Sequence, residues 1–567
     1  MLAPRALQAG VAEAAGMSAQ AGADERVTCP LSELAMKQLG GLDELFFAME
    51  RPNQCMHVAV LGIYDPSTAP GGRVRLRDIM AHIRERLDVS PVLRRRLVRV
   101  PFDLDRAYWV DEAEVDLEYH IRHIALPRPG DWRHLCIQVA RLHSLVLDRS
   151  KPLWQIYVIE GIDNVEGVKP GSFAIYMKFH RGEVDGEASA KILRALHSLI
   201  AMPEHSHVLK KPFFADAVPT LVELYARSLS NAVPRVVRLW HAVSTAGVKL
   251  TSLASRALYK RVAGGTLGER LLDELAWPQH PVKTRFAGSV SSRRIVEGVG
   301  FEMAKVQRVR KWVSGVTTND VFLATVGGAV RRYLQESGDP LSAGVAAAVP
   351  ASHQDILPGS DQGNKLNQHR VPLHVEIESG LVRLRAIRQS AGETRQTADV
   401  IGHDLLRQLA DELPTRITSA VVDSLLDDYL NIVVSTVRGP DVPLYLAGAQ
   451  LNRFYPIGVV KNGVGLNITS FSYCGNLWAT VVSCRKMMPD PEIFANCLRE
   501  SFDSLVAEVD REELAKRSQA EPAAAPLRAR KRRAPAAVAG QPAVPGTAPH
   551  HPVRARLSTK TAPFGNA

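Results

Sequence analysis

Cysteine is scarce in this sequence, and the cysteines that are present do not have the spacing of a metal site. The 567 residues include 6 cysteines, scattered along the chain without a CxxC pair. They are Cys29, Cys55, Cys136, Cys474, Cys484 and Cys497. This scattering argues against a zinc site and against a disulfide framework, and it is compatible with a reducing compartment.

Long apolar runs are absent as well. No stretch approaches eighteen uninterrupted apolar residues, so the sequence predicts no membrane-spanning helix. Residues 1–34 are rich in Ala and Gly and lack the continuous apolar segment of a signal peptide. We interpret residues 1–34 as a disordered leader, and we expect a cytoplasmic protein that is not secreted.

Negative charge is missing from the C-terminal end of the chain. From Arg528 onward there are eight Lys or Arg residues and no Asp or Glu, and these account for eight of the eleven net positive charges. The remaining net charge of +3 gives the folded part no charge-based reason to bind nucleic acid. Residues 513–567, which are Pro/Ala-rich and basic, are predicted to form a disordered tail. That tail either keeps the chain soluble or contacts anionic lipid or nucleic acid.

The rest of the sequence has the composition of a multidomain globular protein. It is 46% hydrophobic and 23% charged, and it is too long for one ordinary core. Strand-like and helix-like segments mix in residues 35–215 and again in residues 284–512, which predicts two α+β subdomains around a shared cleft. Residues 216–283 are predicted to form a basic helical crossover. This crossover either lies on an anionic bilayer surface or packs on the protein between the subdomains.

The segment "MKFHRGEVDGEAS", residues 177–189, holds the candidate catalytic residues. Strand alternation before it places Arg181 on the face of the apolar side chains and His180 on the opposite face. Asp185 is placed to cap the following helix, and Gly186 permits a tight turn. A histidine at such a strand end suits general-base catalysis, because its pKa lies near neutrality.

The motif HRGEVDG resembles the HHxxxDG signature of acyltransferases that share the chloramphenicol acetyltransferase-like fold. Further segments between Leu42 and Asp490 narrow the resemblance to the bacterial wax ester synthase/acyl-CoA:diacylglycerol acyltransferase family, because they follow in that family's order. They are "LDELFFAMERPNQCMHVAVL", "PVLRRRL", "YWVDEAEVDLEYHI", "LDRSKPLWQIYVIEGI" with the PLW element Pro152-Leu153-Trp154, "TTNDVFLA" with the ND element Asn319-Asp320, and "STVRGPDVPLYLAGAQL", which is similar to an SNVPGP block.

The resemblance implies an α+β fold of two subdomains enclosing a central tunnel. Acyl-CoA would meet a diacylglycerol or a long-chain alcohol there, and the product would be a triacylglycerol or a wax ester. Neither metal nor cofactor nor covalent intermediate is implied, and contact with a membrane or lipid-inclusion surface is peripheral. In this family the second motif histidine is regarded as the base and the aspartate as the residue that shapes the turn. His180, Asp185 and Gly186 match the first histidine, the aspartate and the glycine.

Arg181 departs from that pattern, because it occupies the position of the base. A guanidinium stays protonated at ordinary pH and has no lone pair with which to accept a proton. Three interpretations stay open. His180 takes over in a distorted turn; or Arg181 stabilises the oxyanion or pairs with Asp185 in a weakened enzyme, with the base absent or supplied by solvent; or the chain is catalytically silent and binds lipid or acyl-CoA.

The remaining family elements supply candidate substrate-binding residues. These are Pro152, Leu153, Trp154, Asn319, Asp320, Gly439 and Pro440. Structural roles compete at several of them: Trp154 suits a core, and Asn319-Asp320 suit the cap of a helix beginning at Val321. The histidines His57, His120 and His123 are interpreted as ordinary polar or core residues.

Two further alternatives are weighed. A condensation-type acyltransferase acting on carrier-protein thioesters shares HHxxxDG, but the PLW and ND elements argue against it. A silent lipid- or membrane-binding protein is suggested by Arg181 and by the basic segments.

Overall fold

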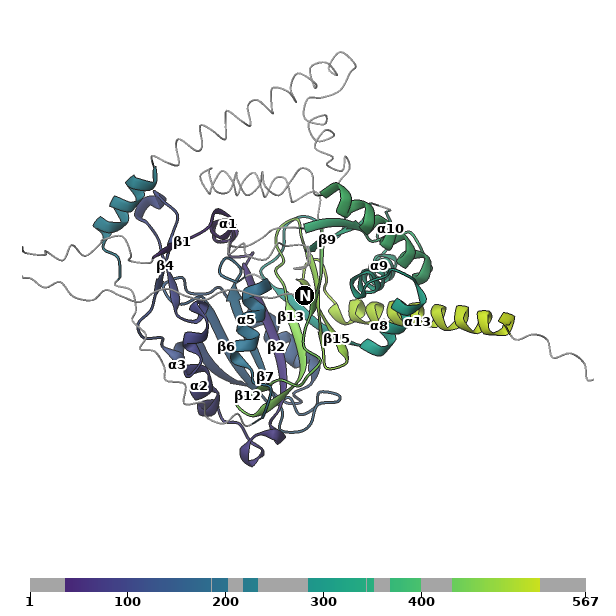
Figure 1. Cartoon of the computed structure of the whole chain (residues 1–567), viewed down its shortest axis with the longest axis horizontal. Helices are drawn as coiled ribbons and strands as arrows, with labels where there is room; N and C mark the ends of the chain where they lie inside the picture. The colour runs from purple at the N-terminus through teal and green to yellow at the C-terminus, as the bar shows by residue number, and fades with distance from the viewer. Residues whose placement is uncertain are drawn as a thin grey trace, which may run out of the picture. The chain divides into compact units, whose positions relative to one another are not determined.

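The computed structural model describes seven stretches of the chain (Figure 1). They are residues 36–184, 186–201, 218–232, 284–342, 344–350, 368–398 and 431–520. The chain divides into two compact units, residues 1–512 and 513–567. The predicted leader and most of the predicted crossover and tail lie outside the described residues, and the subdomain boundaries at 215 and 284 stay predictions.

The first six-stranded sheet combines strands from both halves of the chain. In spatial order they are β12 (Tyr445–Leu446), β13 (Ala449–Ile457), β2 (His57–Asp65), β7 (Phe173–His180), β6 (Trp154–Glu160) and β5 (Ile121–Ala125). Only β5 and β6 pair in parallel within this sheet, so the sheet is mixed. Strand β7 confirms the alternating strand that the sequence predicts before the motif.

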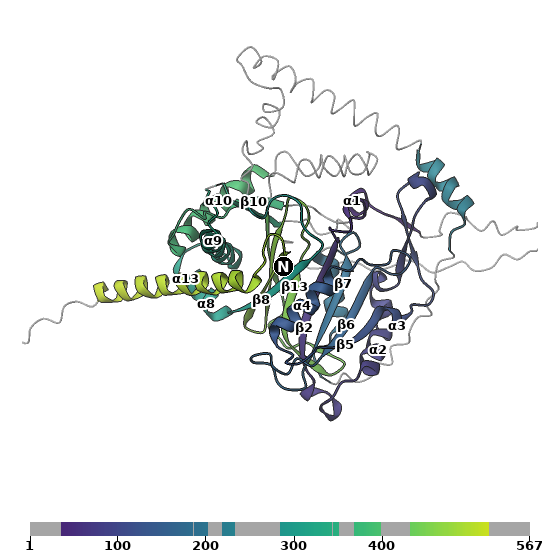
Figure 2. The ribbon, with the colours of Figure 1, turned by 180° about the vertical axis from the view of Figure 1, so that it is seen from behind.

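Helices cover this sheet, and a small three-stranded sheet stands beside it. The helices of this part are α1 (Gly41–Met49), α2 (Leu76–Arg84), α3 (Leu117–His120), α4 (Trp132–His143) and α5 (Gly186–Leu196), and the small sheet has the order β1 (Lys37–Gln38), β4 (Tyr108–Asp111), β3 (Arg95–Val98). Apolar residues of α2, α3 and α5 pack on one face of β7, and those of α4 pack on the other. Figure 2 shows α2 and α3 near β5 and β6.

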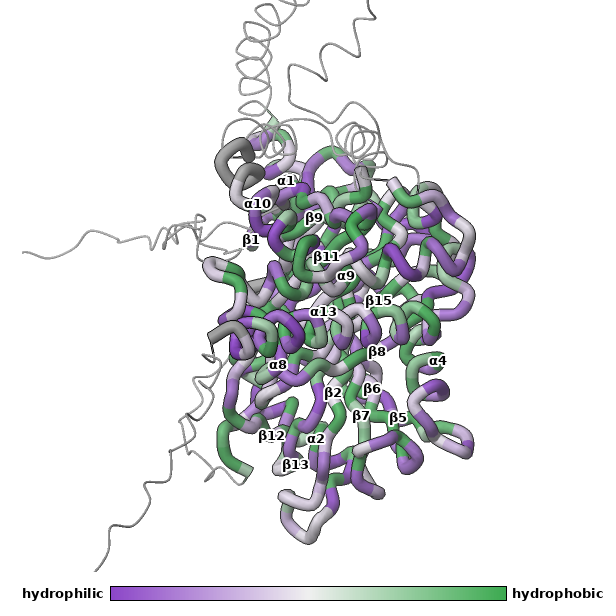
Figure 3. Tube along the Cα trace, turned by 90° about the vertical axis from the view of Figure 1, so that its right-hand side faces the viewer, coloured by the Kyte–Doolittle hydropathy of each residue, from purple (hydrophilic) through white to green (hydrophobic). Residues whose placement is uncertain are grey.

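The second six-stranded sheet belongs to the C-terminal half. Its order is β10 (Gln368–Pro372), β9 (Ala346–Pro350), β11 (Ile432–Arg438), β14 (Leu466–Tyr473), β15 (Asn476–Cys484), β8 (Arg294–Glu302), and its helices are α8 (Met303–Trp312), α9 (Thr318–Glu336), α10 (Gly380–Ala398) and α13 (Pro491–Ala520). Strand β11 pairs in parallel with both β9 and β14. Hydrophobic stretches run along the strands of both sheets (Figure 3). Two mixed sheets with helices confirm the predicted α+β class, whereas the tunnel stays a prediction.

Two helices end earlier than their apolar periodicity predicts. Helix α4 ends at His143, and Val146, which the pattern assigns to its buried stripe, is 56% exposed. Helix α5 ends at Leu196, and Leu199 is 67% exposed. At the first end, the buried ammonium of Lys178 donates to the Leu142 carbonyl in the last turn of α4 and to the Leu145 carbonyl just beyond the helix.

The two sheets meet where α4 packs against β8. The Trp132 indole N–H donates to the carboxylate of Glu297 in β8, and the ring lies 5.0 Å from that of Tyr455 in β13. Gly298 makes this approach possible, because a Cβ there would lie 2.6 Å from Trp132 and 2.8 Å from Tyr455. The seam therefore depends on a residue without a side chain.

We expect Gly298→Ala to destabilise the protein by about 1–3 kcal/mol, because the added methyl has no space between two rings. Gly392→Ala is the matched control: Gly392 lies inside α10, and its Cβ would meet nothing within 4 Å. Alanine is the better helix former there, so that variant should lose no stability. Thermal unfolding of both variants checks the expectation, and equal melting temperatures for the two would contradict it.

Candidate active site

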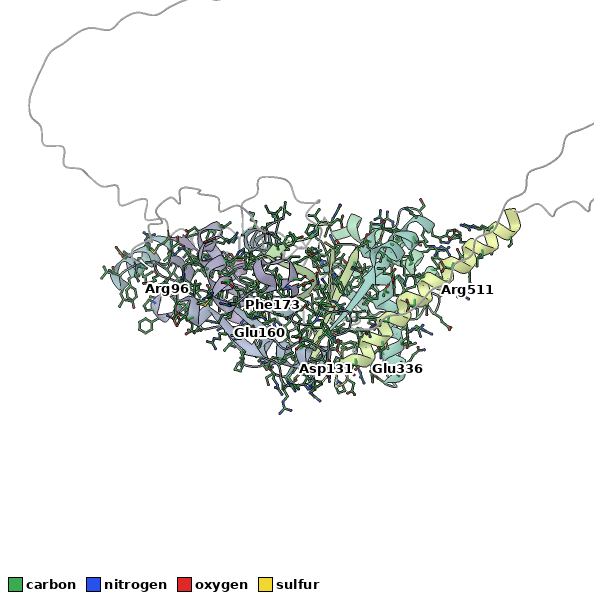
Figure 4. The ribbon with its side chains drawn as sticks, turned by 90° about the horizontal axis from the view of Figure 1, so that it is seen from below. Arg96, Asp131, Glu160, Phe173, Glu336 and Arg511 are labelled. Carbon is green, nitrogen blue, oxygen red and sulfur yellow. The ribbon has the colours of Figure 1, made fainter. Side chains whose placement is uncertain are left out.

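Strand β7 delivers the candidate motif from the middle of the first sheet. Phe173, Ile175, Met177 and Phe179 join one apolar cluster, and Ala174 and Tyr176 join the cluster on the other face, as the alternation predicts. Figure 4 labels Phe173 at the start of β7 and Glu160 at the end of its neighbour β6. His180 is the last residue of β7, so the chain turns immediately after it.

One ring nitrogen of His180 is hydrogen-bonded, and the other faces a carboxylate without a hydrogen bond. The side chain is fully buried, and its ring stacks on Phe47 at 4.0 Å. The Gly182 backbone N–H donates to Nδ1 at 3.1 Å, so the ring hydrogen lies on Nε2, which is 3.6 Å from Oε1 of Glu50. Burial lowers the pKa of His180, and Glu50 opposes this shift. His180 is therefore neutral and has no unoccupied lone pair with which to deprotonate a hydroxyl.

The carboxylate of Glu50 is the buried charge of this site. Its Oε1 lies 3.3 Å from Nε2 of His57 and also accepts the Met56 backbone N–H at 3.3 Å. Its Oε2 accepts two N–H groups of Arg149, at 2.7 and 3.2 Å. Burial alone would raise the pKa of Glu50, but its interactions with His180 and His57 outweigh burial, and the net shift is downward. The group is thus an anion at neutral pH.

His57 is a site residue that the sequence analysis misses. It is fully buried, it pairs in register with His180 across β2 and β7, and the two rings lie 5.9 Å apart. Burial lowers its pKa to about 4. The burial of His57 confirms its interpretation as a core histidine, but the sequence does not predict that it lies beside the motif. The available signal is the N-terminal family segment, which contains both Glu50 and His57.

Arg181 folds back on its own turn. Its backbone N–H donates to the Met56 carbonyl at 2.7 Å, and its Nη1 donates to the Val184 carbonyl at 2.9 Å. Its guanidinium carbon lies 4.9 Å from the centre of the Phe46 ring. Asp185 lies outside the described residues, and Gly186 is the first residue of α5. The turn thus holds a fixed positive charge at position 181.

A second carboxyl, Glu183, lies buried in the same turn and is not among the predicted residues. Its Oε1 accepts from Nε of Arg95 at 2.8 Å, and Arg95 stacks over Trp109 at 4.5 Å. Burial raises the pKa of Glu183 to about 7, although Arg95 acts in the opposite direction. The turn therefore contains a carboxyl group that titrates near neutral pH.

The PLW element lies directly beside the motif. The His180 backbone N–H donates to the Leu153 carbonyl at 3.0 Å. Trp154 is fully buried, donates from Nε1 to the Leu93 carbonyl at 3.0 Å, and stacks on His120 at 4.2 Å. The structural role of Trp154 is confirmed, and substrate binding by Pro152 and Leu153 stays a prediction.

The ND element caps a helix, but one that begins earlier than predicted. Helix α9 starts at Thr318 with Thr317 as its N-cap. The Thr317 hydroxyl accepts the Asp320 N–H at 3.1 Å, and Asp320 accepts the Thr317 N–H at 2.8 Å. The predicted start at Val321 is wrong because this reciprocal capping box places Asp320 at the third helical position. Asn319 lies in the same first turn.

Gly439 and Pro440 follow β11 in the second sheet. The Gly439 N–H donates to the Ser472 hydroxyl at 3.2 Å, and a Cβ at Gly439 would lie 2.3 Å from the Phe471 ring. Among the described residues, no hydrogen bond or ion pair joins either Gly439 or Asp320 to His180. Their role in substrate binding stays a prediction.

Two surveys of the described residues bear on cofactors and membranes. No group of three or more His, Cys, Asp or Glu side chains is placed to hold a metal ion within these stretches. Among the helices of the described stretches, none has the length and apolarity needed to cross a membrane. That neither metal nor cofactor takes part in the reaction stays a prediction from the sequence.

The two mixed sheets, with a histidine-ended central strand and its turn, agree with the α+β fold that the motif resemblance implies. Residues 39–322 match the family model described as the wax ester synthase/diacylglycerol acyltransferase catalytic domain, and residues 362–506 match that of the WS/DGAT C-terminal domain. The chain therefore belongs to the wax ester synthase/diacylglycerol acyltransferase family, as the motifs predict.

Individual relatives agree with this assignment. A Mycobacterium tuberculosis protein that carries a diacylglycerol O-acyltransferase name is 31% identical over 80% of this chain and 87% of its own. The O-acyltransferase WSD of Acinetobacter baylyi is 29% identical over 83% of this chain and 98% of its own. The wax ester synthase/diacylglycerol acyltransferase of Marinobacter aquaeolei shares the fold, with a TM-score of 0.57 at 22% identity, over 84% of this chain and 100% of its own.

The raised pKa of Glu183 predicts a pH-dependent stability. Its folded pKa of about 7 exceeds the ordinary glutamate pKa of 4.5, so folding stabilises the protonated form. This contribution is present below about pH 4.5 and is lost as the pH rises through about 7. Glu183→Gln keeps a neutral side chain at every pH. Relative to the unmodified protein, its melting temperature should therefore rise between pH 5 and pH 8.

Glu112→Gln is the control for this measurement. Glu112 pairs at 2.6 Å with Arg96, the neighbour of Arg95 in β3, but its side chain is 34% exposed to solvent. The difference in melting temperature between Glu112→Gln and the unmodified protein should be the same at pH 5 and at pH 8. A pH-independent difference for Glu183→Gln would show that Arg95 keeps the carboxyl ionised throughout.

Proposed function

We propose that this chain transfers a fatty acyl group from acyl-CoA to the hydroxyl of a diacylglycerol or a long-chain alcohol. The hydroxyl oxygen bonds to the thioester carbonyl carbon, the carbon–sulfur bond breaks, and the proton lost by the hydroxyl ends on the CoA thiol. The products are a triacylglycerol or a wax ester and free CoA. The observation that carries the proposal is the turn after His180 at the end of a central strand, in a chain whose two halves match the two family models.

Arg181 determines how well this reaction proceeds. Its guanidinium supplies N–H donors and a permanent positive charge, which suit an oxyanion developing on the thioester carbonyl. It supplies no base, and the one lone pair of neutral His180 is already occupied by the Gly182 N–H. Losing a general base typically costs roughly 10²–10⁴-fold in rate. We therefore place this chain among weakened acyltransferases, and the matched catalytic and C-terminal models argue against a silent lipid-binding protein.

Restoring the imidazole tests this account. Arg181→His should raise the rate of CoA release by roughly 10²-fold or more, because it returns a proton acceptor to the turn. A thiol-reactive spectrophotometric assay with acyl-CoA measures it, once with diacylglycerol and once with a fatty alcohol. Arg77→His is the control, because Arg77 is 74% exposed in α2, and it should change nothing. If Arg181→His releases CoA no faster than the unmodified protein with either acceptor, Arg181 is not the cause of the weak activity.

An exposed apolar helix face favours contact with a lipid surface. In the helix of residues 221–232, Leu224 is buried against Val100 and Tyr108, whereas Leu221, Val222 and Leu229 are 62%, 77% and 72% exposed. These three lie on one side of the helix, next to the buried stripe. Such a face is costly to leave in water, since each side chain gains about 1.5–3 kcal/mol when buried.

The neighbouring hairpin extends the same apolar surface. The turn Pro101–Asp103 presents Phe102, which is 88% exposed and has a positive φ of 61°, and Leu104 follows at 57% exposure. The helix is tied to this hairpin, because Asn231 donates to the carboxylate of Asp105 at 2.8 Å. We infer that both elements rest on the cytoplasmic surface of a membrane or lipid inclusion, where the acceptor alcohol resides.

Vesicle binding checks this surface. Leu221→Ser combined with Val222→Ser should lower co-sedimentation with phosphatidylglycerol-containing vesicles several-fold, because the apolar contact is removed. Val89→Ser is the control, since Val89 is 60% exposed outside this surface. Equal binding by all three proteins would show that residues 221–232 do not form the lipid contact.

A further inference from the structure

The carboxylate of Glu50 is placed to control the catalytic turn without touching it. It reaches His180 from the side opposite to Gly182: Nε2 of His180 lies 3.6 Å from Glu50, and Nδ1 accepts the Gly182 N–H at 3.1 Å. The imidazole therefore links a buried anion to a backbone amide of the turn. The geometry and the chemistry of imidazole together decide which nitrogen carries the hydrogen.

Only one tautomer of His180 satisfies both neighbours. With the hydrogen on Nε2, the ring donates toward the Glu50 carboxylate and accepts from Gly182. With the hydrogen on Nδ1, two N–H groups would face each other, and a nitrogen lone pair would face an anion. The carboxylate thus selects the tautomer that binds the Gly182 amide, in the way that an outer carboxylate orients a metal-bound histidine.

Glu50 is itself fixed by four separate parts of the chain. It follows α1, its Oε1 faces His57 at the start of β2, and Arg149 holds Oε2 with two N–H groups. The Arg149 guanidinium also donates to the Phe47 carbonyl at 3.0 Å. A carboxylate with this many partners has one orientation, which makes it a precise reference for His180.

The position of the turn depends on His180 because α1 packs closely on its other side. A Cβ at Gly182 would lie 2.6 Å from the Phe47 ring and 2.9 Å from the Asp43 carbonyl, so α1 closes over the turn. The Gly182 amide immediately follows Arg181, whose own N–H is bound by the Met56 carbonyl. A shift of the Gly182 amide therefore changes where the side chain at position 181 points.

We propose that Glu50 is a positioning residue for acyl transfer: through His180 it fixes the Gly182 amide and thereby the side chain at position 181. The proposal rests on the proposed function. It assigns no chemical step to Glu50, which touches neither substrate nor reacting atoms. It differs from a purely stabilising role, because it predicts a loss of turnover in protein that remains folded.

The test compares two His–Glu pairs, His180 with Glu50 and His123 with Glu160. Glu50→Gln is made in the unmodified chain and in the Arg181→His variant. Glu160→Gln is the control, because Glu160 in β6 pairs at 3.2 Å with His123 in β5 and both side chains are exposed to solvent. Glu50→Gln should lower kcat by roughly 10²-fold, with KM for acyl-CoA changed much less, because misplacement of about 1 Å costs this much. Glu160→Gln should change neither.

Histidine ¹⁵N chemical shifts give a second readout that does not depend on activity. In the unmodified chain, the His180 signal, assigned with His180→Asn, should show a neutral ring protonated at Nε2. In Glu50→Gln it should become a mixture of the two tautomers. His180→Asn keeps an acceptor for the Gly182 N–H, but its shorter side chain does not extend to the position of Nε2 beside Glu50. It should lose less turnover than His180→Ala.

The possible outcomes separate the two proposals. If neither the unmodified chain nor Arg181→His releases CoA, the proposed function fails, and the ¹⁵N shifts alone still decide whether Glu50 sets the tautomer. If Glu50→Gln is folded, keeps the Nε2–H tautomer and turns over like the unmodified chain, the positioning role is refuted. If it does not fold, the two His180 variants decide, and equal turnover of the two refutes the role.

Discussion

The buried anion of Glu50 is the interaction on which the arrangement of the candidate site depends. A carboxylate removed from water is tolerated only when charges and hydrogen bonds surround it. Here the partners are the Arg149 guanidinium, the Met56 amide and the imidazoles of His57 and His180. They come from segments far apart in the sequence, so the end of α1 and the ends of β2 and β7 must all be in place together. The position of the motif turn is therefore fixed by the contacts that the buried Glu50 carboxylate needs.

Much of the fold could be predicted, because its signals are local. The alternation in β7 assigns each side chain to the correct face, and the motif order identifies the family. The register between β2 and β7 is not local, which is why His57 could not be placed beside His180. Helix ends were missed because apolar spacing continues past the end of α4, where Lys178, a residue of another element, binds the last turn. The cap at Thr317 was readable, since Thr-x-x-Asp is a capping-box spacing.

The structure narrows the three interpretations of Arg181. Takeover by His180 requires a free lone pair, and the Gly182 N–H occupies the one that a neutral ring has. The turn also differs from the family pattern in electrostatics, because it holds the Arg181 cation and the buried carboxyl of Glu183 with its pKa of about 7. Family membership thus gives the class of reaction, and our proposal of a weakened enzyme rests on the charges of this particular turn.

Strands β12 and β13 have a consequence for how this protein is made. Strand β12 pairs with β13, and β13 completes the first sheet by pairing with β2, although nearly four hundred residues separate Asp65 from its partner Gln450. During synthesis one edge of β2 stays unpaired until almost the whole chain has left the ribosome. Such distant pairing slows folding and exposes a strand edge to other chains. The N-terminal half is therefore no independent folding unit, and chaperones that shield open strand edges should matter most for the nascent chain.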